Sequence, residues 1–386
     1  MQFSAEHESL RRTVAKFVET EINPHVDAWE AAEEFPSHEL FKKLGDLGLL
    51  GIKYDPAHGG LGLDFSYSMV MAEELGLCHA GGVPMAIGVH TDMCTPALNR
   101  FGSDHVKTNF LAPSIAGDVV GCLGVSEPGG GSDVAAVATT ARADGDDYVI
   151  SGTKMWITNG LKADWCCLLA NTSDGPPHRN KSLIAVPMDA RGITRQKIRK
   201  IGMHSSDTAQ LFFDEVRVPR ANLIGQEGMG FTYQMLQFQE ERLYSAASSL
   251  KGFDRLIDLT IEYTGQRRAF GKPILDNQVV HFRLAELRTE VEALRALTWS
   301  AIEQYVAGAD VTRLASMAKL KTGRLAREIT DSCLQYWGGM GYTADNPVSR
   351  AWRDTRLVSI GAGADEIMLG IIAKLEGTLP GTSNRA

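Results

Sequence analysis

The order in which hydrophobic periodicity changes along this chain constrains its fold more than any other feature. Up to about residue 118, apolar residues recur at helical spacing, as at Leu10, Val14 and Phe17. From about residue 119 to residue 230, short runs are apolar or alternate with polar residues, and the sequence Asp144-Gly145-Asp146 predicts a hairpin turn. Helical spacing returns from residue 231 onward. Helices, then a sheet, then helices predict an α+β fold without a doubly wound sheet, with domains at residues 1–118, 119–230 and 231–386.

Composition and charge argue against several kinds of partner. The 44% of hydrophobic residues can bury a large core, and the formal net charge of −8 argues against a nucleic-acid partner held by phosphate contacts. Residues 1–20 are largely polar, and no stretch approaches the roughly 18 apolar residues of a membrane span. We therefore expect no secretory signal, no membrane span and a cytoplasmic protein. The six cysteines lack Cys-x-x-Cys spacing and the histidines lack metal-ligand spacing, which predicts reduced core thiols and no metal site.

A glycine-rich segment at the start of the sheet region is the strongest sign of a ligand site. Residues 123–133 read Leu-Gly-Val-Ser-Glu-Pro-Gly-Gly-Gly-Ser-Asp, and about one hairpin later residues 154–160 read Lys-Met-Trp-Ile-Thr-Asn-Gly. Three consecutive glycines without Cβ atoms let the backbone approach a planar ligand and direct N–H groups at it. Short hydroxyls and an aromatic ring lie beside them, at Ser126, Ser132, Thr158 and Trp156. This mixture suits an isoalloxazine ring better than a bare phosphate. Most glycine-rich loops are turns, however, and this one does not open a helix as a dinucleotide fingerprint does.

A third segment completes a pattern that resembles the acyl-CoA dehydrogenase family. Residues 125–133 resemble the family's first signature, and residues 335–354, which begin Gln-Tyr-Trp-Gly-Gly-Met-Gly-Tyr, resemble its second. Residues 154–160 and 267–271 (Arg-Arg-Ala-Phe-Gly) match two further segments in the same order, so the likeness covers nearly the whole chain. It implies an N-terminal helical domain, a central β domain and a C-terminal helical bundle. The isovaleryl-CoA and long-chain types and bacterial citronellyl-CoA dehydrogenases are the members that the chain resembles most.

The resemblance implies FAD as the cofactor and identifies the residues that would hold it. The flavin half is expected to contact Leu123, Val125, Ser126, Gly131, Ser132, Trp156 and Thr158. The ADP half is expected at Arg267, Phe270, Gln278, Gln335, Gly338 and Gly339, which in relatives reach the neighbouring subunit's cofactor. Ala364 and Glu366 complete the cofactor set, with Ala364 where relatives often have a threonine. A shared site implies at least a dimer, and the resemblance implies a homotetramer built as a dimer of dimers. For any one of these polar residues alone, a surface or capping role would be the commoner reading.

One departure from the family pattern directs attention to the catalytic base. Many relatives carry this base as the glutamate of a Tyr-Glu-Gly-Thr loop, but here the loop reads Ile360-Gly361-Ala362-Gly363-Ala364, so Ala362 stands in its place. The isovaleryl and long-chain types carry the base on an earlier helix within a Glu-Arg-Leu sequence, where this chain has Glu241. Helical spacing groups Glu241 with Phe238, Ser245 and Ser248, and Glu240 with Leu236, Leu243 and Tyr244. Spacing alone leaves both glutamates open, and the missing acid at position 362 favours Glu241.

The resemblance implies α,β-dehydrogenation of an acyl-CoA thioester to the trans-2-enoyl-CoA. Glu241 would remove the α-proton, while a flavin ribityl hydroxyl and the backbone N–H of Ala362 would bind the thioester oxygen. The remaining substrate contacts are expected at Ser132, Arg242, Gly361 and Gly363. An electron-transfer flavoprotein would reoxidise the flavin. Because Gly361 and Ala362 replace a bulkier Tyr-Glu pair, we expect a branched or extended acyl chain, with the pocket floor around residues 89–93 and 235–238.

Three other functions fit parts of the pattern. An acyl-CoA oxidase shares the first half-reaction and passes electrons to oxygen, but such members are usually longer, with an additional C-terminal domain. A nitroalkane oxidase would carry an acid at position 362, where this chain has Ala362. A non-catalytic flavin-binding member would lack a base, and its DNA-associated version would be basic, whereas this chain is acidic and has Glu241.

Overall fold

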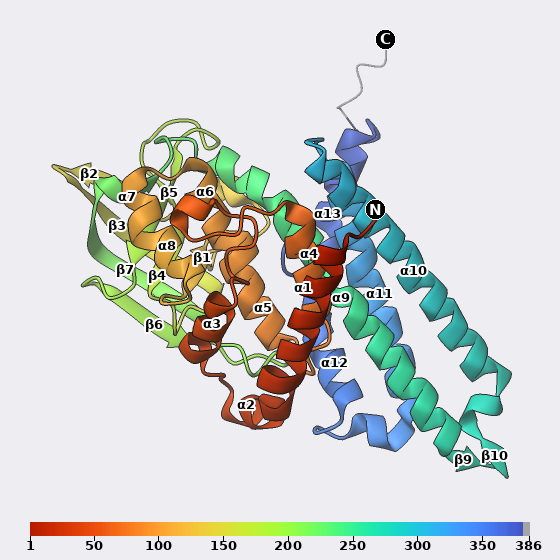
Figure 1. Cartoon of the computed structure of the whole chain (residues 1–386). Helices are drawn as coiled ribbons and strands as arrows, with labels where there is room; N and C mark the ends of the chain where they lie inside the picture. The colour runs from red at the N-terminus through yellow and green to blue at the C-terminus, as the bar shows by residue number, and fades with distance from the viewer. Residues whose placement is uncertain (381–386) are drawn as a thin grey trace.

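The computed structural model describes residues 1–380, and within them three blocks of different secondary structure follow one another along the chain (Figure 1). Residues 381–386, the end of the expected third domain, lie outside the described part. The first block is helical. Its elements are α1 (Ala5–Phe17), η1 (Val18–Ile22), η2 (Asn23–His25), α2 (Val26–Ala32), α3 (Ser37–Asp46), η3 (Pro56–His58), α4 (Phe65–Leu75), α5 (Gly82–Gly88), η4 (Val89–Cys94), α6 (Thr95–Phe101), α7 (Asp104–Val106), η5 (Lys107–Leu111) and α8 (Ala112–Ile115).

The second block forms one mainly antiparallel sheet. Its strands are β1 (Gly121–Gly124), β2 (Thr140–Asp144), β3 (Asp147–Thr158), β4 (Trp165–Asn171), β5 (Lys181–Pro187), β6 (Ile193–Lys197), β7 (Thr208–Pro219) and β8 (Leu223–Ile224). The spatial order is β6-β7-β3-β2-β4-β5-β8, with β1 paired parallel to β4. The predicted hairpin connects β2 to β3, and Gly145 adopts the left-handed conformation (φ 62°) that its turn requires.

Strands β4 and β5 are buried on both faces, because alternate residues enter two different hydrophobic clusters. Cys167 and Ala185 pack with Leu98 and Phe110 of the N-terminal helices, whereas Leu168 belongs to the cluster on the opposite face. This two-sided burial explains why both strands read as continuous apolar runs. The N-terminal helices therefore cover one face of the sheet, as Figure 1 shows.

The third block is a bundle of long helices. Its elements are α9 (Gly230–Gln266), β9 (Arg268–Ala269), β10 (Lys272–Pro273), η8 (Ile274–Asp276), α10 (Gln278–Val306), α11 (Thr312–Trp337), η9 (Gly338–Tyr342), α12 (Pro347–Thr355), η10 (Arg356–Ser359) and α13 (Asp365–Leu375). Leu250, Leu287, Leu294 and Leu325 share its core. Helix α9 also contacts β5, η4 and α4, so this 37-residue helix connects the bundle with both other blocks.

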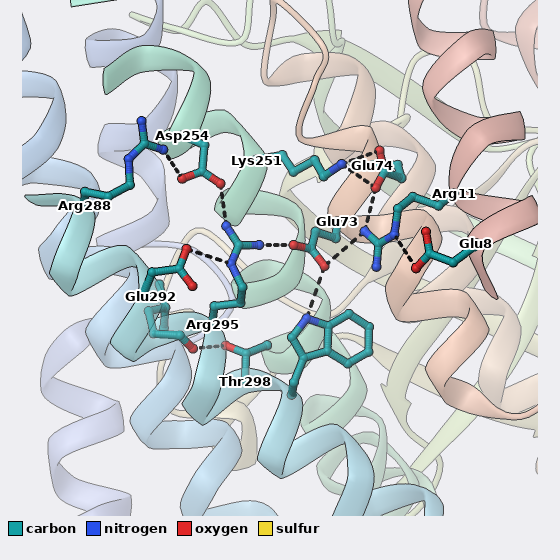
Figure 2. Close-up of polar contacts among 12 residues, drawn as sticks. Glu8, Arg11, Glu73, Glu74, Lys251, Asp254, Arg288, Glu292, Arg295 and Thr298 are labelled. Atoms are coloured by element: carbon teal, nitrogen blue, oxygen red, sulfur yellow. Dashed lines mark hydrogen bonds and ion pairs between the residues drawn. The ribbon is translucent and has the colours of Figure 1, made fainter. Parts of the chain in front are cut away.

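A buried charge network joins the N-terminal helices to the bundle (Figure 2). Glu73 and Glu74 of α4 are almost fully enclosed. Glu74 accepts hydrogen bonds from Arg11 of α1 at 2.7 Å and from Lys251 of α9 at 2.8 Å, while Glu73 accepts one from Arg295 of α10. A buried carboxylate is tolerated only when such partners compensate its lost hydration. The network thus fixes the position of α9 relative to α1, α4 and α10.

All six cysteines are free and buried, as predicted for core thiols. Over residues 1–380, no helix is long and apolar enough to cross a membrane.

Candidate active site

Helix α9 places two neighbouring glutamates in contrasting surroundings, and the first of them is fully paired. Glu240 is 2% exposed and accepts hydrogen bonds from Lys53 Nζ at 2.8 Å and from the Tyr305 hydroxyl at 2.6 Å. The Arg100 guanidinium also donates to it. Burial acts to raise the pKa of Glu240, but the charges of Lys53 and Arg100 outweigh burial and hold the pKa below its ordinary value. Glu240 is therefore an ionised anchor and a poor general base.

The second glutamate lacks such partners. Glu241 is 7% exposed, and within residues 1–380 its Oε2 atom has no hydrogen-bond partner. Burial raises the pKa of Glu241 to about 7, against the opposing charges of Arg242 and Lys319. A carboxylate that is free of hydrogen bonds and titrates near neutral pH has the properties of a general base. The structure thus separates two residues that helical spacing could not.

Two buried amides continue the row of unpartnered groups along α9. Gln234, Gln237 and Glu241 are spaced at i, i+3 and i+7 and share one face of the helix. Both glutamine side chains are fully buried, and neither their oxygens nor their nitrogens have partners among the described residues. Unpaired buried polar atoms are rare in proteins. Gln237 also falls within the segment 235–238 that was expected to form part of the pocket floor. This face of α9 therefore has the properties of a surface that a polar ligand covers.

Arg242 is buried rather than displayed on the helix surface. Its guanidinium lies 5.8 Å from the centre of the Phe238 ring and 3.4 Å from Ser316 Oγ of α11, and its Nε has no partner in the described residues. Burial lowers the pKa of Arg242, which the charge of Glu241 opposes. A guanidinium with free donors beside the base could bind an anionic or carbonyl part of a substrate.

The loop between η10 and α13 lies against α11. Ala362 and Gly363 are both left-handed (φ 55° and 90°), a conformation that alanine adopts rarely. Lys319 of α11 is completely buried, and its Nζ donates to the carbonyl oxygens of Val358 at 2.6 Å and Gly363 at 2.5 Å. The Ala362 N–H makes no hydrogen bond within residues 1–380. It is thus a free donor held in a fixed turn.

The structure brings together the two segments that were predicted to contact the flavin, residues 123–133 and 154–160. Lys154 on β3 is buried and donates to Glu127 Oε1 at 2.8 Å and to the Val125 carbonyl at 3.0 Å, while Met155 N–H donates to the Ser126 carbonyl at 2.8 Å. The glycine loop is therefore attached to the end of β3, which carries the exposed ring of Trp156. Each predicted flavin contact lies here, with Leu123 on β1, Val125, Ser126, Gly131 and Ser132 in the loop, and Trp156 and Thr158 on β3.

This region suits a flavin ring. Added Cβ atoms at Gly129 and Gly130 would meet nothing within 4 Å, so the loop leaves open space at both positions. Trp156 is 60% exposed and left-handed (φ 65°), which is unusual for a large aromatic residue and directs its ring to the surface. An open glycine backbone beside an exposed aromatic face is what a planar aromatic cofactor requires.

The remaining cofactor residues lie elsewhere in the same chain. Arg267 ends α9, Phe270 occupies the β9–β10 turn, Gln278 begins α10, Gln335 lies in the last turn of α11, and Gly338 and Gly339 are in η9. An open groove contains Gln278 and Gln335, together with the exposed Val279 and Phe282. The β9–β10 hairpin lies at the end of the bundle, well away from the sheet (Figure 1). Within one chain, the two groups of cofactor residues are thus not brought together, whereas Gly361, Ala364 and Glu366 lie beside Ala362.

Comparisons with known proteins identify the family to which this α+β protein belongs. The N-terminal, middle and C-terminal domain models of acyl-CoA dehydrogenases match residues 4–118, 122–216 and 228–376. The mitochondrial long-chain specific acyl-CoA dehydrogenase of Sus scrofa is 36% identical over 375 residues, covering 96% of this chain and 86% of the relative. The mitochondrial short-chain specific enzyme of Bos taurus is 36% identical over 369 residues, covering 95% and 89%. The crystal structure of an acyl-CoA dehydrogenase from Geobacillus kaustophilus superposes with a TM-score of 0.92 at 37% identity, covering 97% of this chain and 98% of that chain.

The chain therefore belongs to the acyl-CoA dehydrogenase family. It is an FAD-dependent oxidoreductase that acts on the CH–CH group of acyl-CoA thioesters. The predicted fold class and family resemblance are both confirmed.

Sequence reasoning missed the buried cations that shape the site. Lys154 supports the glycine loop, Lys319 holds the loop of Ala362, and Lys53 pairs with Glu240. A lysine is ordinarily expected at the surface, so composition gave no reason to single these out. The one available signal was Lys154, a charged residue two positions before Trp156 in a recognised segment.

Proposed function

We propose that Glu241 is the base of this acyl-CoA dehydrogenase and that the Ala362 N–H binds the thioester oxygen. The observation that supports this most strongly is the buried carboxylate of Glu241, whose Oε2 atom has no partner within residues 1–380. Burial raises the pKa of this carboxylate to about 7. Glu241 takes the proton from Cα, the electron pair of that C–H bond forms the Cα=Cβ bond, and the hydride leaves Cβ. Bound FAD supplies the acceptor for that hydride. The Ala362 N–H stabilises the negative charge that develops on the thioester oxygen.

The cofactor residues support a site shared between subunits. The flavin half is assigned to the loop around Gly131 and to Trp156, and the ADP half to Arg267, Phe270 and Gln335 of a neighbouring copy. Phe270 is fully exposed and left-handed (φ 49°), which suits a side chain that contacts another molecule. We infer at least a homodimer, and a homotetramer as the complete assembly. Size-exclusion chromatography with light scattering, and identification of the flavin released on denaturation, test both points.

We propose a branched or extended acyl-CoA as the substrate. The small residues Gly361 and Ala362 leave room beside the reacting carbons, and this supports a β-branched chain of the isovaleryl or citronellyl kind. The named relatives include both long-chain and short-chain specific enzymes, so chain length has to be measured. The test compares kcat/KM for butyryl-, octanoyl-, isovaleryl- and citronellyl-CoA with an artificial electron acceptor. A clear preference for butyryl-CoA would contradict the substrate assignment while leaving the enzyme class intact.

An electron-transfer flavoprotein is the proposed electron acceptor. The alternative is an oxidase, in which oxygen reoxidises the reduced flavin. Rapid reoxidation by air-saturated buffer during turnover, with one hydrogen peroxide formed per enoyl-CoA, would favour the oxidase.

A further inference from the structure

Lys319 is buried in a way that its structural contacts do not fully explain. The side chain is 0% exposed, and its two hydrogen bonds go to the neutral carbonyl oxygens of Val358 and Gly363. An ammonium group carries three N–H donors, so one remains without a partner among the described residues. No carboxylate of residues 1–380 lies within ion-pair distance of its Nζ. A neutral donor could hold two carbonyl oxygens equally well. A buried positive charge without a compensating anion is costly to the folded protein.

The loop that Lys319 binds contains a strained turn. Ala362 and Gly363 are consecutive left-handed residues, and alanine keeps such a conformation only where surrounding contacts enforce it. Lys319 binds one carbonyl before this turn and one within it, at Val358 and Gly363. These two contacts fix the direction of the Ala362 N–H, which is the donor assigned to the thioester oxygen.

Lys319 also lies within the electrostatic influence of the base. Helices α9 and α11 pack together, and the positive charge of Lys319 acts to lower the pKa of Glu241 without a direct hydrogen bond. Burial lowers the pKa of Lys319 to about 8, and the charges of Asp365 and Glu241 oppose that fall. The other charged group facing Glu241 is Arg242 of α9, and Asp365 of α13 is itself paired with Arg327 at 3.1 Å.

We propose that Lys319 is a positioning residue for the dehydrogenation, which fixes the Ala362 N–H and supplies the positive charge beside Glu241 and the thioester. This inference rests on the proposed roles of Glu241 and Ala362. Before proton transfer, the negative charge is on Glu241; afterwards it is on the enolate-like substrate. A fixed cation that acts on Glu241 and holds the loop of Ala362 would stabilise the negative charge in each state, without reorganisation of the protein between them.

The test compares Lys319→Met with Lys321→Met. Lys321 lies on the same helix, and its partner is Glu290 at the surface, so this variant controls for the loss of a lysine from α11. We expect Lys319→Met to lower the limiting rate of anaerobic flavin reduction by about 10²–10³-fold, as for loss of an aligned oxyanion donor, with little change in substrate KM. The kinetic pKa should also rise, because Glu241 loses a neighbouring cation. Lys319→Arg, which keeps the charge, should retain the lower kinetic pKa.

A second readout needs neither substrate nor turnover. The contribution of Glu241 to stability, measured as the difference between the wild type and Glu241→Gln, should fall as pH rises from about 4.5 to about 7, because folding raises the pKa of Glu241. In Lys319→Met that fall should continue to higher pH, and the extension should vanish when Glu241→Gln is added. A lower rate with an unchanged kinetic pKa and an unchanged stability profile would reduce Lys319 to a structural role and overturn the proposal. If no acyl-CoA reduces the wild-type flavin, the proposed function fails, and the stability profiles still decide whether Lys319 acts on Glu241.

Discussion

Replacing each of the adjacent glutamates Glu240 and Glu241 by glutamine should change stability in opposite directions. Folding raises the pKa of Glu241 from 4.5 to about 7, and each tenfold change in proton affinity is worth about 1.4 kcal/mol. Above pH 7 the ionised carboxylate therefore costs the folded state about 3 kcal/mol, a cost that falls as pH drops from 7 and disappears below about 4.5. Glu241→Gln removes this cost. We expect it to stabilise the protein at pH 8 and to have little effect at pH 4.5.

Glu240→Gln should do the reverse. Its carboxylate is held by Lys53, Arg100 and Tyr305, and removal of one partner from a buried ion-pair network typically destabilises a protein by about 3–5 kcal/mol. Folding lowers the pKa of Glu240, so the stability that it contributes is present at neutral pH and is lost as pH falls through the folded pKa. Glu240→Gln should thus lower the melting temperature at pH 8, where Glu241→Gln raises it.

In activity, the more stable variant, Glu241→Gln, should be the one that fails, and the less stable variant, Glu240→Gln, should be the one that works. Loss of a general base costs about 10²–10⁴-fold, so Glu241→Gln should nearly abolish flavin reduction by acyl-CoA, whereas Glu240→Gln should retain most of it at a temperature where it is folded. The assays are stopped-flow reduction of the flavin under anaerobic conditions and thermal unfolding at pH 4.5 and pH 8. Glu241 would not be the base if Glu240→Gln lost flavin reduction as severely as Glu241→Gln, and the assigned environments of the two glutamates would be wrong if both variants were destabilised at pH 8.

Four further outcomes follow from individual side chains. The limiting rate of flavin reduction should rise about tenfold per pH unit up to about pH 7 and then level off as Glu241 ionises, whereas a profile flat from pH 5 to pH 9 would exclude this carboxyl as the titrating base. Gln237→Leu removes a buried amide without partners and should stabilise the substrate-free protein by about 1–3 kcal/mol while raising KM; destabilisation in thermal unfolding would mean that the amide is satisfied within the protein. Phe270→Ser should weaken subunit association and FAD retention with little effect on chain stability, checked by light scattering and flavin content. Lys154→Met removes the partner of Glu127 and should raise the Kd for FAD about tenfold or more, measured by reconstitution of the apoprotein, whereas an unchanged Kd would show that the glycine loop holds its shape unaided.

The sequence was sufficient for the fold because its signals are local. The change from helical to alternating spacing near residue 118 and the Asp144-Gly145-Asp146 turn depend on neighbouring residues, and the structure has a helical block, a hairpin between β2 and β3, and a sheet in those places. Family membership could likewise be predicted from four short motifs, and the comparisons confirm it. The three domain boundaries and the assigned site residues remain predictions.

The environment of each glutamate could not be predicted in the same way. Glu240 and Glu241 are both buried on α9, and spacing shows only that they point in directions about 100° apart. What separates them is a set of partners distant in sequence, with Lys53 in a loop, Arg100 on α6 and Tyr305 on α10. The buried position of Lys319 is also a tertiary effect, since the two carbonyls that it binds are 39 and 44 residues away in the chain.

The proposed base lies on a helix that other parts of the molecule hold firmly in place. Helix α9 is fixed on both sides of Glu241, by Lys53 and Arg100 at Glu240, and by Glu74 at Lys251 about three turns later. The loop of Ala362 is a strained turn that accepts two hydrogen bonds from Lys319. A proton transfer needs the carboxylate within hydrogen-bond reach of one carbon-bound proton, so a side chain on the helix is the better constrained choice. The loop needs to offer only a backbone N–H, and this donor survives the change of its side chain to alanine.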